Sequence, residues 1–144
     1  MLTIRLQNII DTLKVDEGFV PHVYQDTEGF WTLGYGFMVD RTRNGRIPQE
    51  VAEFWLAWEV QDLCARVSAA WPAFATQPAQ VQEALINMAY QMGVAGLMSF
   101  RRMRAALERG DRTGAQKEAL DSRWATQTPA RAQRVAAAIG GASS

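Results

Sequence analysis

The residues with the clearest chemical potential in this chain are two carboxylic acids and one hydroxyl near the N-terminus. Eight residues separate Glu17 from Asp26, and five separate Asp26 from Thr32. Two acids in different surroundings can take different roles, one donating a proton while the other activates water. From spacing alone, a turn aspartate and a solvated glutamate at a helix end explain the same residues equally well.

Glu17 is predicted to lie at the end of a helix. Apolar residues recur before it at helical spacing, which indicates one buried face, and Glu17 continues that stripe. The stripe consists of Leu6, Ile9, Ile10 and Leu13. Partial burial and the negative end of the helix macrodipole both favour a protonated carboxyl, so Glu17 is the candidate proton donor. Gly18 follows as a left-handed helix stop.

Asp26 is predicted to lie in a turn, because Asp26 and Gly29 occupy the first and fourth positions favoured in type I turns. We expect Asp26 to stay ionised there. The alternation from Trp31 to Phe37 then predicts one strand with an apolar core face. Its other face carries Thr32 with Gly34 and Gly36. Glycines beside a hydroxyl suggest that a large group approaches the main chain at this point.

This segment resembles the active-site signature of the phage-type lysozymes of the T-even kind, glycoside hydrolase family 24. The catalytic Glu, Asp and Thr of that family, with their eight-residue and five-residue spacings, match Glu17, Asp26 and Thr32. Residues 86–93, 122–124 and 127–135 also resemble the helical lobe of that family, in the same order. Two features depart from the pattern: Phe37 stands where many relatives have His, and the stretch 38–46 is short.

The resemblance implies an α+β, mainly α fold with two lobes, in which a long helix joins a small β-hairpin lobe to a helical lobe. The whole chain, residues 1–144, is expected to be a single lysozyme domain. Apolar periodicity predicts the long helix over about 51–70 and a central helix after Pro78. Further helices are predicted at about 99–108 and 112–121, followed by a last one that begins at Pro129, is capped by Thr128 and ends before Gly140.

The resemblance also implies roles for individual side chains. Glu17 is expected to protonate a glycosidic oxygen, and Asp26 and Thr32 to orient and activate water. The reaction implied is inverting hydrolysis of the β-1,4 bond between N-acetylmuramic acid and N-acetylglucosamine in peptidoglycan. Arg131 is expected to pair with Glu17, which opposes the effect of burial. The expected substrate contacts are Gly34, Gly36, Asn87, Gln91, Trp124 and Gln127. No metal or organic cofactor is expected.

Composition favours one globular domain, since 144 residues with 48% hydrophobic content suffice for a substantial core. Cys64 is the single cysteine, excludes an internal disulfide and is predicted to pack in the core. Polar residues interrupt the N-terminal apolar run, so neither a signal peptide nor a membrane span is predicted. We therefore expect a monomer that accumulates in the host bacterial cytoplasm and reaches peptidoglycan at lysis. A membrane-pore protein, or holin, would give access without stable binding; injection by a phage tail is the alternative route.

The charge is unevenly distributed although the net charge is zero. Residues 1–98 carry six Lys or Arg against eleven Asp or Glu, whereas residues 99–144 carry nine against four. A basic segment can attract an anionic polymer, but Arg101, Arg102 and Arg104 stand in no recognisable nucleic-acid module. No nucleic-acid partner is expected.

Two other functions remain open from sequence. The first is a non-catalytic peptidoglycan-binding module on the same fold, which the intact acidic set argues against. The second is a helical protein that binds nucleic acid through its basic part, which the glycine-lined hairpin argues against.

Overall fold

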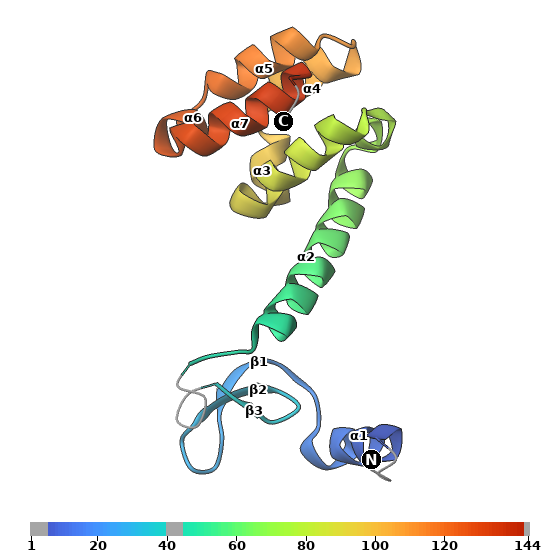
Figure 1. Cartoon of the computed structure of the whole chain (residues 1–144), viewed down its shortest axis with the longest axis vertical. Helices are drawn as coiled ribbons and strands as arrows, with labels where there is room; N and C mark the ends of the chain where they lie inside the picture. The colour runs from blue at the N-terminus through green and yellow to red at the C-terminus, as the bar shows by residue number, and fades with distance from the viewer. Residues whose placement is uncertain (1–5, 40–44, 143–144) are drawn as a thin grey trace. The chain divides into compact units, whose positions relative to one another are not determined.

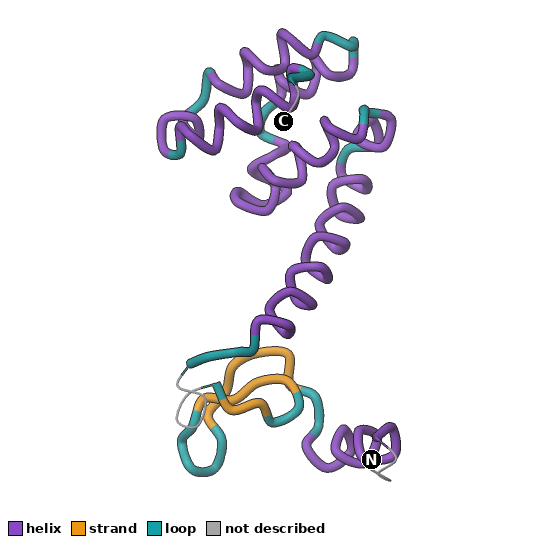
Figure 2. Tube along the Cα trace, viewed as in Figure 1, coloured by secondary structure: helices purple, strands orange, loops and turns teal. Residues whose placement is uncertain are grey.

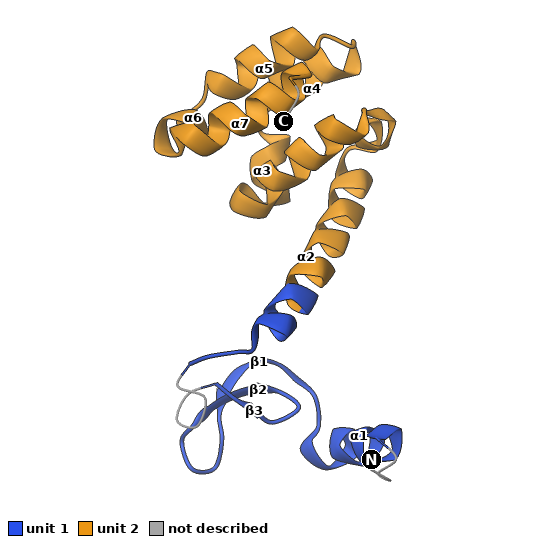
Figure 3. Cartoon of the chain, viewed as in Figure 1, with its two compact units in different colours: residues 1–54 blue, residues 55–144 orange. Residues whose placement is uncertain are grey.

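The computed structural model describes residues 6–39 and 45–142. The predicted α+β, mainly α lysozyme-like fold is confirmed (Figure 1). The chain forms two compact units, residues 1–54 and 55–144, coloured separately in Figure 3. The single-domain assignment over residues 1–144 stays a prediction. Residues 40–44, which belong to the short stretch 38–46 noted in the sequence, lie outside the described residues.

The N-terminal unit consists of helix α1 (Leu6–Glu17) and a small antiparallel sheet (Figure 2). The strands are β1 (Val20–Gln25), β2 (Trp31–Gly34) and β3 (Phe37–Met38), in the spatial order β1-β2-β3. Tyr24 pairs with Thr32, and Leu33 pairs with Phe37. The register between β1 and β2 shifts between Val20 and Tyr24, as expected for a bulge.

The prediction of one strand from Trp31 to Phe37 is wrong. The chain reverses at Tyr35 and Gly36, so β2 and β3 form a hairpin. The predicted faces are wrong as well, because Trp31 and Phe37 are 47% and 54% exposed while Thr32 is only 3% exposed. Alternation of side chains could not reveal the reversal, since residues on either side of a tight hairpin can alternate as they do along one strand.

The predicted helix before Gly18 is confirmed, but its predicted buried face is not. Helix α1 buries none of its residues, and its apolar side chains are exposed. Glu17 is exposed too, which overturns its predicted partial burial. Among the described residues of the N-terminal unit no hydrophobic side chain is buried. A unit of this size has too little apolar surface to enclose a core alone.

The predicted long helix is confirmed as α2 (Gln49–Ala70), which begins directly after Pro48. A short 3₁₀ segment, η1 (Pro72–Thr76), follows, and α3 (Ala79–Met98) then begins after Pro78. The backbone of α3 is interrupted at Gly93, whose φ of 80° is not helical. The central helix therefore consists of two helical segments that meet at this glycine, a break that the apolar stripe does not indicate.

The remaining helices agree closely with their predicted ranges. They are α4 (Arg101–Glu108), α5 (Arg112–Leu120), α6 (Arg123–Gln127) and α7 (Pro129–Gly140). Thr128 precedes α7 as predicted, but its hydroxyl makes no cap hydrogen bond and donates instead to the carbonyl of Trp124 at 3.2 Å. Helix α6 was not predicted. Its N-cap is Ser122, which accepts a hydrogen bond from the N–H of Ala125 at 3.2 Å.

The hydrophobic core lies in the C-terminal unit and is centred on α3. The largest fully buried side chains come from four helices and include Leu85, Met88, Leu97, Met103 and Ile139. Cys64 is half-buried and packs against this core, as its predicted packing role requires. In the described part of the chain, no helix combines the length and hydropathy needed to cross a membrane.

Replacing Leu85 by Ala is expected to lower the free energy of unfolding by about 2–5 kcal/mol, because a fully buried leucine is lost and a cavity remains. The matched control is Leu120→Ala, which removes the same atoms from an exposed position and should cost less than about 1 kcal/mol. Chemical denaturation followed by circular dichroism measures both. Equal losses would contradict the assignment of the core to α3.

Candidate active site

The Glu17 carboxyl lies against the backbone of the β2–β3 hairpin at Gly36. A methyl group placed on Gly36 would come within 2.6 Å of Oε2 of Glu17. Helix α1 ends as predicted, with Gly18 in the left-handed conformation at φ 70° and its N–H donating to the Lys14 carbonyl at 3.0 Å. The Glu17 carboxyl therefore lies close to the backbone of one of the two predicted hairpin glycines.

The second hairpin glycine, Gly34, lies under an aromatic ring. A methyl group placed there would come within 2.7 Å of the Phe37 ring. Both glycines therefore contact side chains of the N-terminal unit, rather than leaving an open strand face. The contacts of Gly34 and Gly36 with a substrate stay a prediction.

Asp26 occupies the predicted turn. The Gly29 N–H donates to the Asp26 carbonyl at 3.0 Å, which closes the turn. One carboxylate oxygen, Oδ1, accepts the N–H groups of Glu28 at 2.9 Å and Phe30 at 2.8 Å. In the described part of the chain, Oδ2 accepts no hydrogen bond. One oxygen therefore fixes the carboxylate, and the other remains available to a ligand or to water.

Thr32 and Asp26 are tied to the same residue. The Thr32 hydroxyl donates to the Phe30 carbonyl at 3.0 Å, while the Phe30 N–H donates to Asp26. Since the hydroxyl proton is engaged, the Thr32 oxygen keeps its acceptor capacity. Thr32 is also the one buried polar residue among those described. The backbone of Phe30 thus links the two side chains, a role that sequence reasoning missed because it is carried by main-chain atoms.

The predicted residues of the C-terminal unit form two hydrogen-bonded pairs. Arg131 on α7 donates from Nε to Oδ1 of Asn87 at 2.9 Å and from a terminal nitrogen to the Asn87 carbonyl at 3.2 Å. Trp124 on α6 donates from Nε1 to Oε1 of Gln91 at 2.9 Å. Helices α6 and α7, which follow one another in the sequence, are therefore both bonded to the distant helix α3.

These pairs fix the orientation of both amides. Guanidinium and indole nitrogens can only donate, so the oxygens of Asn87 and Gln91 must face Arg131 and Trp124. The two amide NH₂ groups make no hydrogen bond within the described residues and are available as donors. Both side chains are exposed. Gln127 is exposed at the end of α6, where no side-chain hydrogen bond joins it to the pairs.

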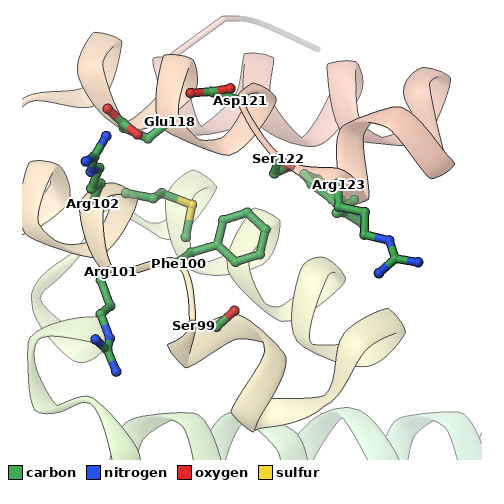
Figure 4. A pocket seen from close by; sticks show the side chains of 10 residues that line it. Ser99, Phe100, Arg101, Arg102, Glu118, Asp121, Ser122 and Arg123 are labelled. Carbon is green, nitrogen blue, oxygen red and sulfur yellow. The ribbon is translucent and has the colours of Figure 1, made fainter.

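A hollow of about 450 Å³ adjoins Trp124 on the C-terminal unit (Figure 4). The Phe100 ring meets Trp124 edge-on at a centroid distance of 6.1 Å. Three arginines, Arg101, Arg102 and Arg123, also line the hollow. The side chains of Arg101 and Arg123 point away from the Phe100 ring. The lining residues are Ser99, Phe100, Arg101, Arg102, Met103, Glu118, Asp121, Ser122, Arg123 and Trp124.

The three arginine side chains of the hollow have no partner among the described residues. Arg101, Arg102 and Arg123 make neither a side-chain hydrogen bond nor an ion pair in the part of the chain that the structure describes. Sequence reasoning identified the basic segment but missed the hollow, which is formed by residues from both sides of α5. Over the same described residues, no group of acidic, histidine or cysteine side chains has the arrangement needed to hold a metal ion.

Comparison with known proteins agrees with this geometry. The phage lysozyme family model matches residues 14–137, which includes the Glu17, Asp26 and Thr32 set and all the predicted residues of the helical unit. The chain belongs to the phage lysozyme family. This membership confirms the resemblance found in the sequence and supports a lysozyme-like, glycoside hydrolase type of function.

Individual relatives of the phage lysozyme family differ in size. The chain is 32% identical to the pre-baseplate central spike protein of Enterobacteria phage T4, over 89% of this chain but 27% of that protein. Two proteins of Dictyostelium discoideum named as probable T4-type lysozymes are 28% and 24% identical, over 93% and 90% of this chain and 94% and 92% of their own lengths.

The predicted pairing of Arg131 with Glu17 joins residues of different units and stays a prediction.

The Gly36–Glu17 contact generates a test with a matched control. Gly36→Ala and Gly29→Ala both place a Cβ at positive φ, 72° and 85°, and each should cost about 1–2 kcal/mol of stability. A Cβ at Gly29 meets nothing within 4 Å, whereas one at Gly36 displaces Glu17. Only Gly36→Ala should therefore lower lysozyme-type activity, by about tenfold or more, at a temperature where both variants are folded. Equal activities would contradict a role for this contact.

Proposed function

We propose that this protein is an endo-acting muramidase, which hydrolyses the β-1,4 bond between N-acetylmuramic acid and N-acetylglucosamine in peptidoglycan with inversion. The observation that carries the proposal is the arrangement of the N-terminal unit. The Glu17 carboxyl lies beside the backbone of Gly36, while Asp26 and Thr32 are both bonded to the backbone of Phe30. Membership of the phage lysozyme family supports the same reaction class.

Glu17 acts as the general acid in this proposal. Its protonated carboxyl donates a proton to the glycosidic oxygen as the bond to the sugar breaks. The close approach of the Gly36 backbone restricts where the carboxyl can lie. Such restriction favours catalysis, because an acid held in its reacting position does not lose orientational freedom when the bond is attacked.

Asp26 and Thr32 act on the attacking water. Oδ2 of Asp26 accepts one proton of this water, and the Thr32 oxygen accepts the other, since its own proton is given to the Phe30 carbonyl. With both protons engaged, a lone pair of the water is directed at the sugar carbon. Inverting glycosidases need this water on the face opposite the acid. No metal or organic cofactor enters the reaction.

The C-terminal unit supplies sugar-binding groups. The outward NH₂ groups of Asn87 and Gln91 are donors suited to the carbonyl oxygens of N-acetyl groups and to sugar hydroxyls. Trp124 orients Gln91 and Arg131 orients Asn87, so these two residues act through the amides they hold. Gln127 is proposed as a further, more peripheral contact, and Arg131 also as the partner of Glu17.

The arginine-lined hollow beside Trp124 is proposed to attract the carboxylates of the wall polymer. Its three guanidinium groups, which have no ion pair within the described residues, outnumber the two carboxylates in the lining, those of Glu118 and Asp121. Guanidinium groups form charge-assisted hydrogen bonds with carboxylates and raise the rate at which a charged polymer associates. A nucleic-acid partner is not part of the proposal.

Access to the wall is proposed to come through a membrane-pore protein, or holin, without stable binding to it. In this route the protein accumulates as a monomer in the host bacterial cytoplasm and is released at lysis. Delivery by a phage tail is the alternative route. It draws support from the relative named as the central spike protein of the phage T4 pre-baseplate.

The main test compares the wild type with Glu17→Gln on purified peptidoglycan. The wild type should release reducing ends, and the amide variant should lose at least about 10³-fold in rate, because it cannot donate a proton. Asp26→Asn is expected to lose a comparable factor, since water activation fails. Proton NMR of the first product should show the α anomer. Clearing by Glu17→Gln at the wild-type rate, or a β anomer, would overturn the proposal.

The same experiment decides the alternative of a non-catalytic wall-binding module. Glu17→Gln keeps the shape of the side chain, so it should still sediment with peptidoglycan. If the wild type sediments with peptidoglycan but releases no reducing ends, the binding module is the correct function.

A second prediction concerns the hollow. Replacing Arg101, Arg102 and Arg123 together by Gln should weaken binding to peptidoglycan by about tenfold at low ionic strength, and the difference should shrink as salt increases. The charge-matched control replaces Arg66, Lys117 and Arg134, which are exposed and lie outside the hollow. Sedimentation with peptidoglycan over a salt series measures both. Equal weakening would show that only net charge matters.

A further inference from the structure

Tyr35, at the tip of the β2–β3 hairpin, contacts residues on both sides of Glu17 in the sequence. Its ring centroid lies 5.4 Å from that of Phe19, in a tilted arrangement, and the Lys14 ammonium lies 5.9 Å from the ring centre. On its other side, Tyr35 meets the Phe37 ring edge-on at 6.4 Å. These geometries are those of favourable aromatic and cation–π contacts. Tyr35 thus connects the end of α1 to the hairpin.

Within the N-terminal unit, helix α1 depends on such contacts because the unit buries no face of this helix. It buries none of its residues, and it joins the sheet through Gly18 and Phe19. The Glu17 carboxyl nevertheless lies against Gly36, the residue that follows Tyr35. A few side-chain contacts at the end of α1 therefore determine where this carboxyl lies.

We propose that Tyr35 is a positioning residue for Glu17, holding the end of α1 against the hairpin so that the Glu17 carboxyl stays beside Gly36. The inference rests on the proposed function for its catalytic consequence, but the contact itself can be measured without activity. Tyr35 acts through its ring, since its hydroxyl makes no hydrogen bond within the described residues.

The test compares Tyr35→Ala with Tyr35→Phe, which keeps the ring and removes only the hydroxyl. On soluble, uncrosslinked peptidoglycan chains, Tyr35→Ala should lower kcat by about tenfold or more and change KM by less than about twofold, because the acid is misplaced while sugar binding persists. Tyr35→Phe should retain the wild-type kcat. Wild-type kcat in Tyr35→Ala, or equal losses in both variants, would overturn the proposal.

A second readout is structural. Wild type and Tyr35→Phe should show nuclear Overhauser contacts between the Glu17 side chain and the Gly36 α protons, and Tyr35→Ala should lose them. If the wild type releases no reducing ends, the proposed function fails, and these contacts alone decide the positioning role. If they persist in Tyr35→Ala, the positioning role fails whatever the activity.

A surface substitution covers the case in which Tyr35→Ala does not fold, as circular dichroism would reveal. Lys14→Gln removes the cation above the ring at an exposed helix position. It should lower kcat by about twofold to fivefold and weaken the Glu17–Gly36 contacts, as expected for an exposed cation–π contact. Unchanged kcat together with unchanged contacts would overturn the proposal in that case.

Discussion

The hydrogen bonds that Asp26 and Thr32 make with the backbone of Phe30 are the interactions on which the N-terminal unit depends. No hydrophobic side chain is buried among the described residues of this unit, so packing cannot fix its functional groups. Polar contacts do so instead: Asp26 holds the turn that starts β2, and Thr32 holds the strand just beyond it. The two bonds use different backbone atoms of Phe30, its N–H and its carbonyl, so this one residue links both side chains.

The C-terminal unit positions its groups in a different way. A continuous core around α3 fixes the helices, and the predicted amides lie on the exposed side of that same helix. Arg131 and Trp124 then set the direction of each amide. Trp124 is itself buried in the core, and its indole hydrogen bond therefore holds the Gln91 amide in a defined position. A packed core that fixes the helix, with available amide donors on its exposed side, is the combination that the proposed sugar binding requires.

Sequence reasoning succeeded where local signals and burial agree. The stripe through Val81, Leu85 and Met88 predicted the central helix, and all three residues are buried. Asp26 and Gly29 predicted their turn, because turn chemistry is local. The sequence pattern did not reveal the turn at Tyr35 and Gly36, because side chains on the two sides of this turn alternate as they would along one strand. It also predicted a buried face for α1, whose apolar stripe is exposed. It could not identify Phe30 or the direction of the amides, since those roles depend on backbone atoms and on distant partners.

The exposure of Glu17 changes the physical account of how it could act as an acid. The apolar stripe of α1 predicted that this helix partly buries the Glu17 carboxyl. The stripe is exposed, so it does not remove water from the carboxyl. What the N-terminal unit provides is position, through the contact with Gly36. Under the proposed mechanism, the sugar chain that covers Glu17 must itself exclude water from the carboxyl. Proton donation is then coupled to substrate binding, because the protein fixes the geometry and the substrate completes the environment.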